Sequence, residues 1–266
     1  MPEAARVLRP GGTLLLEVGA DQAGAVSLLA IWVAPKGLPL LAQAALTVAL
    51  VTPFGPLLYR LAYESLAEAS VLVLLIVSVG VHFALVGLGL FFFCAEGFRN
   101  PSFWDARFSI GALTLSGQTI IIFAASLALI VGLWLFFERS LAGKALRATA
   151  VNQLGARLMG IRTASAGRLS FTMAAFIGAL SGLLIGPTTT VFYDSGFLIG
   201  LKGFVAAVIA GLSSYPGALV GALFVGVIES FGSFWASAFK EVIVFTVILP
   251  VLLARSLYSG HSDEDH

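Results

Sequence analysis

Long apolar runs separated by shorter polar intervals set the pattern of this chain. Residues 70–95, 118–137 and 169–192 are three clear examples. A helix rises 1.5 Å per residue and needs about 20 mostly apolar residues to cross a bilayer. These runs reach that length, and they do not alternate strictly as the strands of a membrane barrel do. The pattern therefore predicts an all-α, polytopic integral membrane protein with about six to eight spanning or re-entrant helices.

The first predicted span carries two prolines. Residues 38–59 are long enough to cross, but Pro53 and Pro56 are expected to bend the helix, because proline lacks an N–H donor and crowds the preceding turn. Residues 60–69 follow as a short polar link. The apolar run at 25–34 is too short to cross a bilayer alone.

An interrupted apolar segment is predicted near the C-terminus. Residues 205–212 are apolar but short, the Ser-Ser-Tyr-Pro-Gly sequence at 213–217 turns the chain, and residues 218–235 are apolar again. Such a break is typical of a discontinuous or re-entrant element, which is tolerated only where protein or water lines it. Residues 242–257 form the last predicted span, and residues 259–266 are expected to be a disordered tail.

One long polar interval, residues 139–168, divides the apolar chain. It is strongly basic, and its only nearby acid is Glu138; its basic residues are Arg139, Lys144, Arg147, Arg157, Arg162 and Arg168. Lys and Arg near span ends are retained on the cytoplasmic side, so this interval is predicted to be a cytoplasmic loop and residues 96–117 to lie outside. Its glycines and alanines leave room for another protein to approach the backbone. The alternative is a merely solvated basic connector.

Composition narrows the class of protein. The chain is 59% hydrophobic and 11% charged, with a mean hydropathy of +1.00, whereas soluble domains have about 25% charged residues. The single cysteine, Cys94, excludes an internal disulfide, and three histidines leave little for a metal site. Gly143 and Lys144 lack the glycine spacing and hydroxyl of a phosphate-binding loop, and no HExxH or paired-cysteine motif is present. These absences favour a protein that is not an enzyme.

Small residues four apart follow the polar interval. Ala174, Gly178, Gly182 and Gly186 place a smooth stripe along one face of the predicted helix, a spacing that allows close helix packing in lipid. A kinked or flexible helix near Pro187 is the alternative. We assign the same packing role to Gly217 and Gly221.

Two ionisable side chains fall at predicted membrane depth and are candidate pathway residues. His82 lies in the middle of a span, and Glu229 lies towards the outer end of a glycine-rich helix. Ionisable groups in a membrane are expensive and usually face a partner or a water-filled path. The structural alternatives are a neutral, hydrogen-bonded histidine and a glutamate bonded to a helix end or a neighbouring subunit.

Two stretches resemble the permease subunits of branched-chain amino acid type ABC importers. They are GKALRATAVNQLGARLMGI (143–161) and GLKGFVAAVIAGLSSYPGALVGALFVGVIES (200–230), and the second is closer to the H-type subunit than to its M-type partner. The resemblance extends from about residue 38 to residue 257. It implies that residues 143–160 seat on an ATPase subunit, with these coupling residues: Gly143, Lys144, Arg147, Ala148, Asn152, Gly155, Arg157 and Gly160.

The resemblance also implies partners. They are an M-type permease, two ATPase subunits and an extracytoplasmic binding protein, with ATP bound by the ATPases and no cofactor held by this chain. The chain would be a multi-pass protein of the cytoplasmic (inner) membrane that contacts lipid and a small-molecule substrate but no nucleic acid. Leucine, isoleucine and valine lead the substrate expectations, with urea, short amides and other amino acids open. The competing hypothesis is a self-sufficient secondary transporter or channel, which the scarcity of membrane acids disfavours.

The N-terminal segment departs from this pattern. Residues 1–24 are too polar to span and resemble the C-terminal end of a class I methyltransferase domain, with a Pro-Gly-Gly turn before a strand at 13–18. No cofactor-binding loop accompanies them. We interpret the segment as a misplaced start or a fused remnant that stands in place of the first span of the family. Residues 25–258 are then the predicted permease domain.

Overall fold

The computed structural model describes residues 39–66, 69–110, 113–209, 215–247 and 250. It divides into two compact units, Met1–Gly200 and Leu201–His266. Our predictions for residues 1–24, 25–34 and 259–266 lie outside the described residues, as does most of the predicted span after residue 247.

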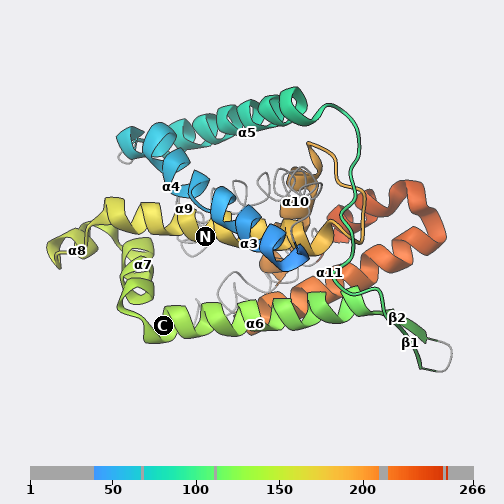
Figure 1. Cartoon of the computed structure of the whole chain (residues 1–266). Helices are drawn as coiled ribbons and strands as arrows, with labels where there is room; N and C mark the ends of the chain where they lie inside the picture. The colour runs from blue at the N-terminus through green and yellow to red at the C-terminus, as the bar shows by residue number, and fades with distance from the viewer. Residues whose placement is uncertain (1–38, 67–68, 111–112, 210–214, 248–249, 251–266) are drawn as a thin grey trace. The chain divides into compact units, whose positions relative to one another are not determined.

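The described residues form a helical membrane protein, which confirms the predicted fold class. Five helical segments are long and apolar enough to cross a membrane: Leu40–Leu66, Leu72–Phe92, Gly117–Arg139, Thr163–Ile185 and Gly217–Val247. A shorter apolar helix, α10 (Ser195–Ile209), lies between the last two. Figure 1 shows these elements along the chain.

The first span is broken at the predicted prolines but extends further than predicted. Helix α3 (Leu40–Val51) ends before Pro53 and α4 (Phe54–Leu58) follows, continued by a π-helical turn (Tyr59–Tyr63) and a 3-10 turn (Glu64–Leu66). The predicted end near residue 59 was therefore wrong. The rings of Tyr59 and Tyr63 pack on a distant side chain, which holds the helix beyond that residue.

Helix α9 (Thr163–Ile185) is the centre of the first unit. It contacts α3, α4, the π-helical turn, α6 and α7. Phe171 on α9 packs between the rings of Tyr59 and Tyr63, with centroids 5.4 and 4.9 Å away. Ala175 and Ala179 are fully buried. The small residues of α9 therefore let its neighbours approach closely.

Two further spans present apolar side chains outward. Helix α5 (Val71–Phe93) begins at Ser70, and α6 (Gly117–Arg139) begins at Ser116; in each, the serine hydroxyl accepts a hydrogen bond from a main-chain N–H three residues on. No residue in the most apolar window of α6 is buried. Exposed Leu, Ile and Phe side chains on a helix of this length are what a lipid-facing surface requires.

Main-chain hydrogen bonds join two connecting segments at the predicted outer end. Phe98 and Val191 exchange main-chain hydrogen bonds of 2.9 and 2.8 Å, and Asn100 N–H donates to the Gly186 carbonyl at 3.1 Å. The chain then forms a two-stranded antiparallel hairpin of β1 (Arg107–Ile110) and β2 (Leu113–Ser116). We predicted a loop over 96–117, so this hairpin is an addition to the all-helical prediction.

The second unit contains the rest of α10 and helix α11 (Tyr215–Ala236). A 3-10 turn (Ser237–Phe239) and a helical segment at 240–247 follow. A small apolar core joins the three helical segments through Val205, Ala206, Val225 and Val244. A short helix followed by a long one agrees with the predicted interrupted element, although the connecting residues 210–214 lie outside the described residues.

Candidate functional site

The basic interval forms two short helices rather than a loop. Helix α7 (Leu141–Val151) starts at Ser140, whose hydroxyl accepts a hydrogen bond from Gly143 N–H at 2.9 Å. Helix α8 (Gln153–Leu158) starts at Asn152, whose carbonyl oxygen Oδ1 accepts from Gly155 N–H at 3.0 Å. Both residues are strongly preferred N-caps, so the sequence itself divides the interval into two helices.

The two-helix segment is fixed to the membrane helices on both sides. A Cβ atom on Gly143 would overlap the Phe136 carbonyl oxygen and lie 2.7 Å from the Phe137 Cα, so α7 packs directly on the end of α6. Helices α7 and α8 also contact α9. Figure 1 shows α7 and α8 at one end of α6 and α9, where they connect the two. Gly143 therefore faces the protein interior and supports the segment from within.

An open groove of about 390 Å³ lies between α7 and α8. It brings together four of the predicted coupling residues, Arg147, Ala148, Asn152 and Gly155, and its remaining lining residues are Val151, Ala156, Met159 and Ile161. The other predicted residues do not line it.

The predicted residues outside the groove have separate positions. Lys144, Arg157 and Gly160 are exposed, and the Arg157 guanidinium Nε donates to the Thr163 hydroxyl at 3.2 Å. Gly160 has a φ of 81°, a left-handed conformation that ends α8 and that glycine adopts without strain.

Four exposed apolar side chains, here called the apolar tip, lie at and beside this groove, and we did not predict them from the sequence. Val151, Leu154, Leu158 and Met159 are 73%, 69%, 80% and 83% exposed. Their helical spacing inside a polar interval was the available signal, but we weighed only the basic and small residues. Apolar side chains grouped on a surface outside the membrane spans are typical of a site that contacts another protein or the membrane surface.

The charge beside the groove is already partly paired. The Arg147 guanidinium lies 2.7 Å from a Glu138 carboxylate oxygen, both side chains are 45% exposed, and the guanidinium lies 5.9 Å from the centre of the Phe137 ring. Exposed ion pairs contribute about 0–1 kcal/mol. The apolar tip therefore offers a larger binding contribution than this arginine.

The predicted packing glycines lie in closely packed positions. Gly178, Gly182 and Gly186 are buried on or just after α9, and a Cβ atom on Gly186 would lie 2.6 Å from the Asn100 side-chain nitrogen. In the second unit Gly221 is buried, and a Cβ atom there would overlap the carbonyl oxygen of Ala206. Gly217 is half-buried.

The two candidate pathway residues belong to different units. His82 on α5 packs its ring near Phe83 and Phe197, with centroids 5.4 and 5.1 Å away. Glu229 on α11 lies 2.6 Å from the Lys202 ammonium. We expected Glu229 to face a partner or a water-filled path, without naming the partner. The structure places Lys202 of α10 opposite it.

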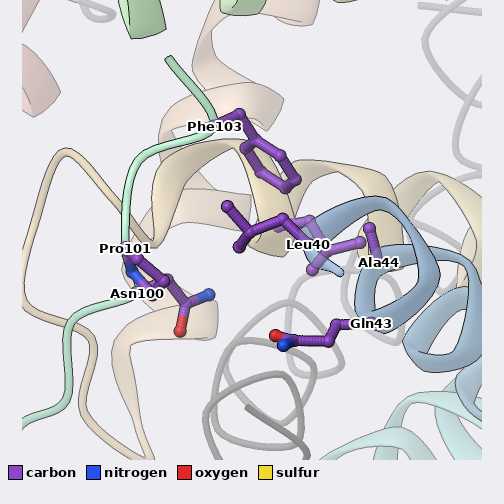
Figure 2. Close-up of a pocket in the computed structure, with 7 residues that line it drawn as sticks. Leu40, Gln43, Ala44, Asn100, Pro101 and Phe103 are labelled. Atoms are coloured by element: carbon purple, nitrogen blue, oxygen red, sulfur yellow. The ribbon is translucent and has the colours of Figure 1, made fainter. Parts of the chain in front are cut away.

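A small cavity with two amide side chains in its lining lies near the predicted outer end of the first unit. It has a volume of about 20 Å³ and is lined by Leu40, Gln43, Ala44, Asn100, Pro101, Phe103 and Leu183. The amide groups of Gln43 and Asn100 point towards one another across it (Figure 2). Asn100 Oδ1 is buried without a hydrogen-bond partner among the described residues. The cavity has room for one water molecule. Elsewhere in the described ranges, no group of three His, Cys, Asp or Glu side chains lies together as a metal site requires.

Comparison with known proteins gives a family match. Residues 13–252 match the family described as "Branched-chain amino acid transport system / permease component". The chain is 32% identical over 225 residues to the permease protein BraD of Pseudomonas aeruginosa, covering 82% of this chain and 73% of that protein. It is 30% identical over 216 residues to LivH of Escherichia coli K12, covering 77% and 69%. Both relatives are described as high-affinity branched-chain amino acid transport permeases. No solved structure matches.

These findings decide between the classes of protein that the sequence left open. The matched range covers the spans, the two-helix segment α7–α8 and both compact units. It confirms the predicted resemblance, favours an importer subunit over a self-sufficient transporter, and identifies a transport permease rather than an enzyme. The methyltransferase-like resemblance of residues 1–24 stays a prediction. This chain belongs to the family of branched-chain amino acid transport system permease components.

Proposed function

We propose that this chain is the H-type permease subunit of an ATP-driven importer in the cytoplasmic membrane. Its complex would contain an M-type permease, two ATPase subunits that bind ATP, and an extracytoplasmic binding protein. The names of its relatives, all branched-chain amino acid permeases, support leucine, isoleucine and valine as the first substrates to test. Because a binding protein delivers the substrate, that protein sets most of the specificity.

The observation that carries the proposal is the exposed surface of α7 and α8. The sequence has no phosphate-binding loop, so in an ATP-driven importer the ATP would be bound by another protein. The basic interval is predicted to face the cytoplasm. There the apolar tip formed by Val151, Leu154, Leu158 and Met159 stands beside an open groove. An apolar tip of this kind suits insertion into a cleft of an ATPase subunit.

The same segment has a route for transmitting movement into the membrane. Gly143 packs α7 against the end of α6, and only the four residues 159–162, Gly160 among them, join α8 to α9. Helix α9 in turn contacts α3 and α4. A displacement of the docked tip would therefore reach both α6 and α9, and α9 is the centre of the first unit.

Reconstitution in vesicles tests the proposal. Uptake of leucine, isoleucine or valine should require all the proposed partners and ATP, and should be absent from vesicles that contain this chain alone. An ion gradient without ATP should not replace the partners. Uptake by the chain alone, driven by an ion gradient and indifferent to ATP, would show instead a secondary transporter.

A further inference from the structure

The described part of helix α10 is shorter than a membrane span. Its 15 residues span about 22 Å at 1.5 Å per residue, less than the roughly 30 Å of the hydrocarbon core. A helix that reaches both interfaces is fixed in depth by its polar ends, whereas a shorter one depends on the protein around it. The contacts of α10 with the rest of the protein therefore help to fix its depth and rotation, and those made by residues 201–209 lie within the second unit.

One such contact is apolar. Val205 and Ala206 are 1% and 4% exposed and pack with Val225 and Val244. A Cβ atom on Gly221 would overlap the Ala206 carbonyl oxygen, so the backbones of α11 and α10 meet there. This contact fixes the distance between the two helices. Dispersion contacts are not directional, so they restrain sliding and rotation less strongly.

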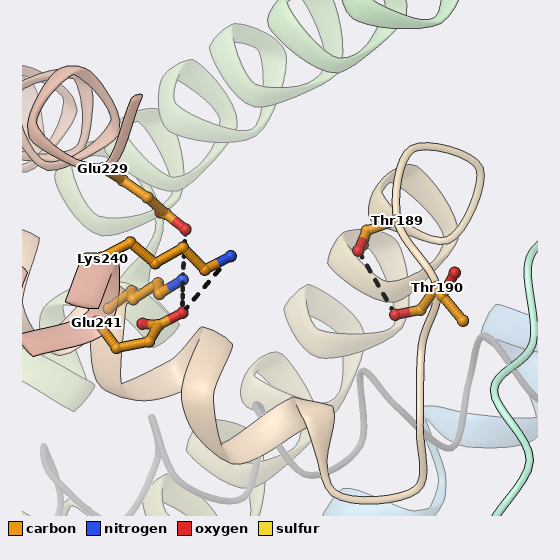
Figure 3. A network of polar contacts seen from close by, with 6 residues as sticks. Thr189, Thr190, Glu229, Lys240 and Glu241 are labelled. Atoms are coloured by element: carbon orange, nitrogen blue, oxygen red, sulfur yellow. Dashed lines mark hydrogen bonds and ion pairs between the residues drawn. The ribbon is translucent and has the colours of Figure 1, made fainter. Parts of the chain in front are cut away.

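The other contact is a shared cation. The Lys202 ammonium on α10 lies 2.6 Å from Glu229 Oε1 on α11 and 3.0 Å from Glu241 Oε1 in the segment 240–247. The three side chains are only 21%, 28% and 34% exposed. Figure 3 shows Glu229, Glu241 and Lys240 side by side, with dashed lines for the contacts of the two carboxylates. Lys240 contacts Glu241 from further away, at 3.9 Å, and is 43% exposed.

We propose that Lys202 is a positioning residue that fixes the depth and rotation of the short helix α10. Charges in apolar segments are costly, and well-packed apolar side chains of similar volume often replace a buried ion pair without loss of stability. What an apolar replacement cannot supply is a short, directional bond to two other helical segments at once. This positioning role of Lys202 does not depend on whether transport by the protein is driven by ATP.

Distance measurements between spin labels test this role in the full chain. Gly203→Cys on α10 and Gly226→Cys on α11 are suitable positions, because a Cβ atom at either would meet nothing within 4 Å. Both are introduced with Cys94→Ala, spin-labelled and studied in lipid nanodiscs. The parent should give a single narrow distance distribution. Lys202→Met should broaden it and displace its mean, and Lys202→Arg should restore the narrow distribution.

Two further variants separate positioning from simple charge balance. The double variant Lys202→Met and Glu229→Gln leaves Glu241 paired with Lys240, so it should insert in the membrane even where Lys202→Met alone does not, yet still give the broad distribution. Lys240→Met is the matched control and should keep the narrow one. A narrow distribution in the double variant, or equal broadening by Lys240→Met, would overturn the proposal.

Discussion

Gly55 on α4 lies directly against the main chain of Phe171 on α9. A Cβ atom on Gly55 would overlap the Phe171 carbonyl oxygen and lie 2.9 Å from the Ala175 Cβ. Because the obstacle is backbone, a side-chain rotation cannot relieve it. The crossing of α4 over α9 therefore depends on the absence of a single carbon atom.

Gly55→Ala should consequently destabilise the protein by about 1–3 kcal/mol, the range for overpacked sites. Gly80→Ala on α5 is the control, because a Cβ atom there meets nothing within 4 Å. Alanine is a better helix former than glycine, so the control should be neutral or stabilising by up to about 1 kcal/mol. Thermal unfolding of the purified chain compares the two. Equal melting temperatures for the two variants would show that the close crossing is not required.

A second prediction concerns the groove between α7 and α8. Ala148 lines it, whereas Ala150 is exposed on the same helix but outside it. Ala148→Trp should fill the groove, weaken co-purification with the ATPase subunits and abolish substrate-stimulated ATP hydrolysis in reconstituted complexes. Ala150→Trp adds the same bulk on another face and should reduce both much less. Membrane insertion should be normal in both variants. The groove is not the docking site if Ala148→Trp complexes form and hydrolyse ATP normally.

The third prediction separates apolar docking from electrostatic docking. Leu158→Asp or Met159→Asp places a charge on the exposed tip and should lower ATPase binding by at least tenfold, because burying a leucine or methionine side chain contributes about 1.5–3 kcal/mol. Arg147→Glu should have a smaller effect, since exposed ion pairs contribute about 0–1 kcal/mol. Binding affinities measured with the purified ATPase subunit test this order. A larger loss for Arg147→Glu would point to an electrostatic interface.

Membrane orientation gives the fourth prediction. Single cysteines at Ser109 in β1 and at Ala150 in α7, each with Cys94→Ala, should react with a membrane-impermeant thiol reagent from opposite sides. Both residues are exposed, so accessibility of the side chain does not limit the reaction. In intact cells Ser109→Cys should be labelled, and Ala150→Cys only after permeabilisation. The predicted orientation fails if both sites react in intact cells.

Local sequence was sufficient for some elements. Helices α5 and α6 were predicted within a few residues, because each is an unbroken apolar run that follows a capping serine. The extension of the first span to Leu66 was not predicted from the sequence. It depends on the packing of Tyr59 and Tyr63 against Phe171, which lies more than 100 residues later in the chain. Such a contact has no local signal.

In the candidate site, too, some features could be predicted from local sequence and others could not. The position of the coupling segment followed from its charge and from the family resemblance. Its helical form was readable from Ser140 and Asn152, two N-cap residues that we passed over. The pairing of Lys202 with Glu229 was not readable, because nothing local shows which helix faces Lys202. Charge and caps act within a few residues, whereas pairing depends on the tertiary fold.

The joint between α8 and α9 has a mechanical consequence. Only residues 159–162 separate α8 from α9, and Gly160 N–H and Ile161 N–H are bonded back to the Arg157 and Ala156 carbonyls at 3.0 and 2.9 Å. A linker that is this short and hydrogen-bonded to α8 leaves little freedom for α8 to move relative to α9. A force on the apolar tip therefore acts directly on α9, without the delay that a flexible linker would introduce. Lengthening this joint with glycines should therefore weaken the transmission of movement from the apolar tip to α9.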